Sequence, residues 1–152
     1  MHSSPLTESV DAEPIVVAQT TDQPRLAVIG FYSVAVLFNL CLTAQLLTVG
    51  LAYFENPSWW QAHGWLVKGY GGLSLVLVAW VYGVSFPRRI RILTVSMPIL
   101  LGIQFLTIHW HPLFLPLPLA IVHPLVGFFL VSVSSTLVHR VWRIVSPKIS
   151  NG

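Results

Sequence analysis

The sequence predicts an all-α integral membrane protein, an up-down bundle of four helices behind a disordered N-terminal tail. Two long runs contain no Asp, Glu, Lys or Arg: 48 residues between Arg91 and Arg140, and 29 residues between Arg25 and Glu55. Only 9% of the chain is charged and 55% is apolar, whereas soluble domains carry about 25% charged residues. Because charge is costly inside a bilayer, these runs indicate membrane spans.

Residues 1–24 are predicted to form a disordered cytoplasmic tail. The segment is rich in Ser, Thr and Pro and carries four carboxylates, a composition that cannot bury enough apolar surface to fold. It lacks the basic start and the apolar stretch of about 7–15 residues that define a signal peptide. We therefore expect the first span itself to direct insertion into the membrane.

Four spans are expected within residues 25–143, and residues 144–152 are expected to form a cytoplasmic tail. The approximate ranges of the spans are 26–53, 62–86, 90–108 and 119–138. The turn signal Glu55–Ser58 ends the first span, and Pro87 follows the second. Residues 109–118 contain three prolines, which a continuous helix does not accommodate. Short connections make successive spans antiparallel neighbours, which predicts the up-down bundle.

The distribution of basic residues predicts the orientation. Three arginines lie in the loop between the second and third spans, and two arginines and one lysine follow the fourth span. The other two loops contain no Lys or Arg. The positive-inside rule then places both termini in the cytoplasm. The expected location is a bacterial-type inner membrane or an internal energy-transducing membrane, with the lipid bilayer as the first partner.

Several function classes are disfavoured by composition. The net charge of +3 is not gathered on a folded basic face, so no nucleic-acid partner is expected. Cys41 is the only cysteine, which excludes an intramolecular disulfide and a C-x-x-C redox pair. The spans contain no carboxylate pair and no Ser-His-Asp arrangement, so hydrolytic catalysis is disfavoured. An enzyme is not indicated.

A layer of histidines at the outer ends of the spans is the main functional signal. His63 begins the second span and His123 begins the fourth, and His109 and His111 flank the end of the third. Gln45 precedes His63 by 18 residues, and Gln104 precedes His123 by 19. This weak repeat fits two hairpins related by an axis along the membrane normal. The shared depth of these residues follows from the topology with or without a duplication.

His63 and His123 are candidate ligands of b-type haem or a metal ion. The second and fourth helices are diagonal in an up-down bundle, which separates their axes by about 11–14 Å. That spacing suits a planar haem between two histidines better than a small ion bound directly by both. The side-chain oxygens of Gln45 and Gln104 are candidate partners for the second imidazole nitrogen. The alternative is that both histidines are polar groups at the headgroup level.

Three further residues are secondary candidates. His109 and His111 are separated by two positions, so they can chelate a metal only in an extended segment. The alternative for this pair is an interfacial role beside Trp110. Lys68 lies near the outer end of the second span and either extends to the lipid headgroups or pairs with Glu55 or a haem propionate. The glycine cluster at residues 69–72 is expected to be a helix-packing surface.

These motifs resemble a family of small bacterial four-helix membrane proteins without an assigned function. The shared features are a His at the start of a Gly-rich second helix, a segment from Leu100 to Gln104 in the third, and Val122-His123-Pro124 at the start of the fourth. The resemblance covers about residues 26–138. Ile103 and Val122 replace leucines of the family pattern, and Val126 replaces an Asn. The resemblance implies the fold and the histidine pair, not an activity.

Two functional hypotheses follow. In the first, the histidine pair holds b-type haem or a metal and passes electrons to or from a quinone or another redox partner. In the second, the protein is a non-catalytic accessory subunit or assembly factor of a larger membrane complex. Transport is a third hypothesis, since polar residues such as Asn39 and Thr43 lie in the first span. A bundle this small would then have to form a homo-oligomer.

Overall fold

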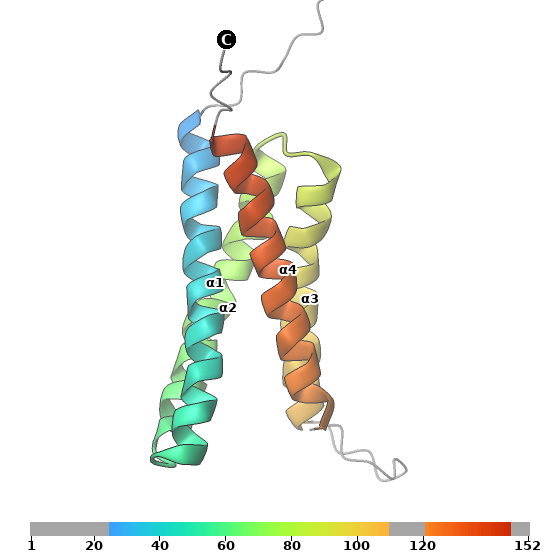
Figure 1. The fold of residues 1–152 in the computed structure, drawn as a ribbon. Coiled ribbons are helices and arrows are strands. Elements are labelled where there is room, and N and C mark those ends of the chain that lie inside the picture. Colours follow the sequence, from blue (N-terminus) through green and yellow to red (C-terminus); the bar gives the residue numbers. More distant parts are fainter. Residues whose placement is uncertain (1–24, 110–120, 147–152) are drawn as a thin grey trace, which may run out of the picture.

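The computed structural model describes residues 25–109 and 121–146 of the chain, and within them it consists of four helices (Figure 1). These are α1 (Arg25–Phe54), α2 (Trp59–Gly83), α3 (Arg88–His109) and α4 (Val122–Val145). Each is long and apolar enough to cross a membrane. The prediction of an all-α, four-span membrane protein is therefore confirmed.

The helix bounds differ from the expected spans, most clearly at α2 and α4. Helix α2 begins at Trp59, just after a turn in which the Asn56 side chain accepts a hydrogen bond from the Ser58 backbone N–H at 2.9 Å. It ends at Gly83, because Val84 is extended. Helix α4 continues through Arg140 to Val145, beyond the expected limit of residue 138. Hydropathy marks the membrane-embedded part of a helix, whereas the helix itself can continue into the aqueous phase. The expected tail at 1–24 lies outside the described residues.

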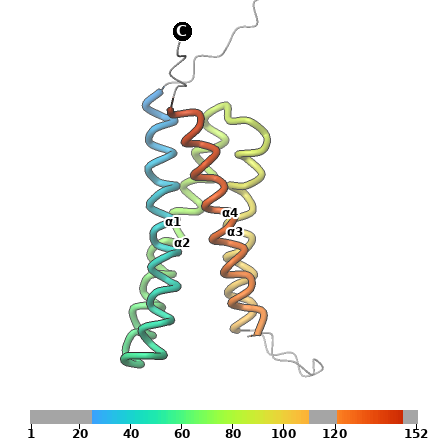
Figure 2. Tube along the Cα trace, in the orientation of Figure 1, coloured from blue at the N-terminus to red at the C-terminus, as the bar shows by residue number. Residues whose placement is uncertain are grey.

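The four helices form a ring in which each contacts its two neighbours. The contacting pairs are α1–α2, α2–α3, α3–α4 and α4–α1, and no contact joins the diagonal pairs across the described residues. Helix α1 begins and α4 ends at the same end of the bundle, here called the terminal end, where residues 84–87 also lie (Figure 1). The opposite end, with residues 55–58, is the turn end. The α1–α2 and α3–α4 hairpins diverge toward the turn end (Figure 2).

The buried positions of the two hairpins correspond to one another. The four buried residues of α2 are Tyr70, Ser74, Leu77 and Val81, and each has a buried partner in α4 at a position 60 residues later: Leu130, Ser134, Leu137 and Val141. All five buried residues of α3 correspond to buried residues of α1 that lie 59 positions earlier. The halves are therefore related by a pseudo-twofold axis along the bundle, the arrangement of parallel membrane repeats.

Sequence identities support the same correspondence. The pattern Leu-x-x-Gln-x-Leu-Thr occurs at residues 42–48 in α1 and at 101–107 in α3. The pattern Ser-x-x-Leu-Val-x-x-Val occurs at residues 74–81 in α2 and at 134–141 in α4. With His63 and His123, these identities extend the weak repeat seen in the sequence along the whole length of each hairpin.

Close packing within the bundle occurs at positions other than the glycine cluster. An added Cβ at Gly69, Gly71 or Gly72 would have no heavy atom within 4 Å, so the expectation that this cluster packs against a helix of the bundle was wrong. At Gly30, in contrast, an added Cβ would lie 2.7 Å from the Trp80 ring. This glycine allows α1 and α2 to approach each other. Many large apolar side chains on the outer faces remain exposed, which is consistent with lipid contact.

Candidate functional site

The structure places His63 in the second turn of α2 and His123 at the start of α4, both near the turn end and both half-buried. Their helices are diagonal in the ring and have no Cα atoms in contact. The two histidines therefore lie on opposite hairpins at the same end of the bundle.

In the first hairpin, three polar residues form a connected group that we call the first triad: Gln45, Thr48 and His63. The Thr48 hydroxyl donates to the Gln45 backbone carbonyl at 2.7 Å. The same hydroxyl lies 3.2 Å from Nδ1 of His63. The Gln45 side chain donates from Nε2 to the His63 backbone carbonyl at 3.0 Å. These bonds link α1 to α2 and fix the ring of His63.

The second hairpin repeats this arrangement in a second triad of Gln104, Thr107 and His123. The Thr107 hydroxyl donates to the Gln104 backbone carbonyl at 2.8 Å and lies 3.3 Å from Nδ1 of His123. Nδ1 of His123 also lies 3.2 Å from the Gln104 carbonyl oxygen. Next to this group, an added Cβ at Gly127 would lie 3.1 Å from Nε2 of Gln104. The absence of a side chain at Gly127 leaves space for the Gln104 amide.

The hydrogen bonds favour one tautomer of each imidazole. Both threonine hydroxyls lie within donating distance of a backbone carbonyl. A carbonyl oxygen only accepts, so Nδ1 of His123 donates to the Gln104 carbonyl. Nδ1 of His63 can donate to the Thr48 hydroxyl in the same tautomer. In the neutral ring this leaves a lone pair on Nε2, the form in which histidine binds a metal.

Each triad also contains a buried acceptor without a partner. The side-chain oxygens Oε1 of Gln45 and Gln104 are buried and receive no hydrogen bond from the described residues. Buried polar atoms are nearly always paired, and the same atom is unpaired in both halves. The expected role of these oxygens was to accept from the imidazoles. The Thr hydroxyls and the Gln backbone carbonyls occupy that position instead, so each Oε1 is available to a hydrogen-bond donor such as water.

The secondary candidates lie apart from the triads. The Lys68 ammonium lies 5.4 Å from the centroid of the exposed Trp65 ring, which favours its interpretation as a residue that extends along the outer surface. His109 is exposed and its Nδ1 lies 2.8 Å from the Phe105 carbonyl oxygen. His111 lies outside the described residues. Within the part of the chain that the structure describes, no three His, Cys, Asp or Glu side chains are grouped to hold a metal.

Sequence reasoning missed Thr48 and Thr107. Both are buried, and each follows its glutamine by three positions, the spacing that places two residues on the same face of a helix. The repeated Gln-x-Leu-Thr pattern was the available signal. An isolated Thr in a membrane helix is common, however, and only the pairing of the helices brings its hydroxyl to a histidine.

Comparison with known proteins gives one match. The model of a family of unknown function, DUF6220, matches residues 45–109. The matched residues include all three members of the first triad and two members of the second, Gln104 and Thr107. His123 lies outside the match. It agrees with the resemblance to a family without an assigned function. A search of the curated proteins found no match, and a search of the solved structures found none.

Proposed function

We propose that this multi-pass membrane protein binds b-type haem between His63 and His123 and transfers single electrons at the expected outer side of the membrane. The observation that supports the proposal most directly is the repeated triad. Two imidazoles on opposing hairpins each have Nδ1 beside a threonine hydroxyl, and the tautomer with the proton on Nδ1 leaves the Nε2 lone pair for a ligand. Paired axial histidines of this kind are a known way to hold haem.

The donor set favours haem over a small metal ion. An ion without a macrocycle would need further protein ligands, and the described residues offer no group of three. Haem supplies its own four equatorial nitrogens and needs only the two axial positions. When bound, it supplies a one-electron couple whose potential depends on the axial ligands and their hydrogen bonds.

The residues of the triads have separate roles in this proposal. His63 and His123 bind the iron through Nε2. Thr48 and Thr107 hold the rings in the required tautomer, a contribution that typically changes affinity by about 10- to 100-fold. Gln45 holds the backbone of α2 at His63 through its Nε2 donor. The unpaired oxygens of Gln45 and Gln104 would bind ordered water beside the ligand.

A reduced-minus-oxidised absorbance spectrum of protein expressed with haem supplied tests the proposal. The expected result is sharp α and Soret bands with one haem per chain, lost in both His63→Ala and His123→Ala. His139→Ala, which removes an exposed histidine near the terminal end of α4, serves as the matched control and should retain the bands. A flat spectrum from folded wild-type protein would refute the haem proposal.

A role as an accessory subunit is the second candidate. The glycine cluster of α2, together with Gly83, has open space where side chains would stand. Such a surface allows another helix to approach closely. Co-purification of a stoichiometric membrane partner in mild detergent would support this role, and a single monomeric species without partners would oppose it.

A further inference from the structure

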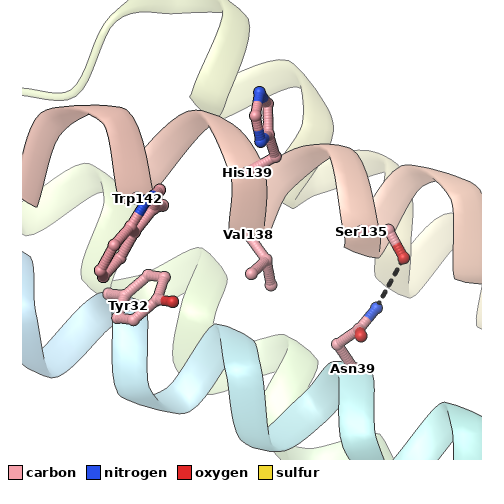
Figure 3. A pocket seen from close by; sticks show the side chains of 6 residues that line it. All are labelled: Tyr32, Asn39, Ser135, Val138, His139 and Trp142. Carbon is pink, nitrogen blue, oxygen red and sulfur yellow. Dashed lines mark hydrogen bonds between the residues drawn. The ribbon is translucent and has the colours of Figure 1, made fainter. Parts of the chain in front are cut away.

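A pocket between α1 and α4 lies toward the terminal end, away from the histidine pair. It has a volume of about 350 Å³ and is lined by Tyr32, Asn39, Ser135, Val138, His139 and Trp142 (Figure 3). None of these residues is Asp, Glu, Lys or Arg. Both helices are long and apolar enough to cross a membrane. In a bilayer this pocket would open toward the lipid phase and be accessible to a molecule dissolved there.

Oxygen and nitrogen atoms lie at both ends of this pocket. At one end, Asn39 donates from Nδ2 to the Ser135 hydroxyl at 3.0 Å and to the Ser134 hydroxyl at 3.2 Å. Ser135 accepts that bond and retains its own O–H as a donor. At the other end, the Tyr32 hydroxyl points into the space below Val138 (Figure 3). Residues 32 and 39 are two helical turns apart, about 10 Å along the axis.

The pocket also has an aromatic wall. The rings of Tyr32 and Trp142 lie 5.6 Å apart at an interplanar angle of 38°. Between the aromatic end and the amide end, Val138 supplies an apolar surface. A flat ring with an oxygen at each of two opposite positions has the shape and the hydrogen-bonding groups that match this lining.

The pseudo-twofold axis provides an internal comparison. The positions that correspond to Tyr32, Asn39 and Ser135 on the α3–α2 interface are Arg91, Pro98 and Leu75. Core residues are repeated between the halves, as Leu137 and Val141 repeat Leu77 and Val81, but the polar lining is not. The α2–α3 interface therefore packs without these hydroxyl and amide groups. Polar side chains inside a span are costly and generally have a functional role.

We propose that this pocket binds the ring of a lipid-soluble quinone, with its hydrocarbon tail in the surrounding lipid. Ser135 and Tyr32 donate hydrogen bonds to the two carbonyl oxygens, and Trp142 covers one face of the ring. The lining contains no Lys or Arg, which opposes a phospholipid phosphate as the recognised group, because phosphate recognition favours such cationic partners. The proposal is independent of haem, since it concerns the other end of the bundle.

Equilibrium binding of radiolabelled decyl-ubiquinone to haem-free protein in lipid nanodiscs tests this proposal. Wild-type protein should bind one quinone per chain, above the level of empty nanodiscs. The variant Tyr32→Phe/Ser135→Leu removes both proposed donors and places at position 135 the residue type found at position 75. It should bind about tenfold or more weakly. Tyr82→Phe is the control, because it removes a phenolic hydroxyl from α2 at the position equivalent to Trp142. Its affinity for the quinone should be within about twofold of that of wild type.

Two results would overturn the proposal: no saturable binding by wild-type protein, or equal binding by the double variant. A second measurement does not depend on the stability of a variant. Photolabelling of wild-type protein with an azidoquinone should modify the peptide that contains Ser135 to Trp142, with protection by excess unlabelled quinone. Labelling confined to α2 and α3, or protection by phospholipid alone, would exclude a quinone site here.

Discussion

The Thr48 hydroxyl lies 2.7 Å from the Gln45 backbone carbonyl and 3.2 Å from Nδ1 of His63, so it connects α1 to the imidazole on α2. A threonine placed three residues after a glutamine thus favours one tautomer of a histidine on the next helix, with the proton on Nδ1. The same relationship between Thr107 and His123 makes it a property of the repeated hairpin. A change to either threonine should consequently affect the histidine without removing it.

Replacement of Thr48 by valine should weaken haem binding, because valine keeps the shape of the side chain and removes the acceptor for Nδ1–H. We expect an affinity loss of about 10- to 100-fold, and a similar loss for Thr107→Val. Haem titration followed by absorbance measures both. Thr136→Val is the matched control, since the exposed Thr136 bonds only to the Ser132 carbonyl of its own helix. Equal affinity in all three variants would contradict the tautomer argument.

Gly30→Ala should destabilise the bundle, because the new Cβ would lie 2.7 Å from the Trp80 ring and must displace it. Overpacking of this kind costs about 1–3 kcal/mol. Unfolding in increasing fractions of a denaturing detergent measures the loss. Gly50→Ala, where an added Cβ has no neighbour within 4 Å, should change stability little. The double variant Gly30→Ala/Trp80→Leu should recover part of the loss, and failure to do so would place the strain elsewhere.

Asn39→Ala should weaken the association of the two hairpins, because Asn39 in α1 donates to Ser134 and Ser135 in α4. Hydrogen bonds between membrane helices contribute about 0.6 kcal/mol on average and at most about 1.7, so we expect a loss in this range. The same unfolding assay applies. Thr43→Ala removes an exposed hydroxyl that bonds only to the Asn39 carbonyl of α1 and should have a smaller effect. A larger effect from Thr43→Ala would mean that Asn39 does not hold the hairpins together.

The expected orientation can be tested with single cysteines in a Cys41→Ser background. Ser58→Cys lies at the turn end and should react with a membrane-impermeant maleimide in intact cells. Ser146→Cys, at the terminal end, should react only after the membrane is opened, because the positive-inside rule places this end in the cytoplasm. The reversed pattern would show that the histidine layer faces the cytoplasm.

The fold was predictable because the membrane imposes a simple energetic rule on the sequence. Charged residues are costly inside the spans, so long stretches with little charge indicated the membrane segments. The turn at Glu55–Ser58, Pro87 and the prolines of residues 109–118 divided them into four helices. The exact ends were not predictable, since local hydrogen bonds decide them. The Asn56 side chain accepts a hydrogen bond within the turn before α2. Helix α4 continues past Arg140 and ends at Val145.

The candidate site was predictable only in part. Equal depth of His63 and His123 follows from the topology, and the paired glutamines were visible from their spacing. The role of Thr48 depended on the rotation of α1 against α2, which the sequence does not specify. The lining of the pocket between α1 and α4 could not be predicted either. Tyr32 and Ser135 lie on helices from opposite ends of the chain, and these helices meet only because the four helices close into a ring.

The joining of two similar hairpins in one chain has a consequence for how the protein can change. In a symmetric dimer of identical hairpins, a substitution at one interface is necessarily present at the other. Here Asn39 faces α4 while its counterpart in α3 is Pro98, so the two interfaces can acquire different residues. A single chain thus allows one interface to carry polar residues that the other lacks, while His63 and His123 keep the same depth.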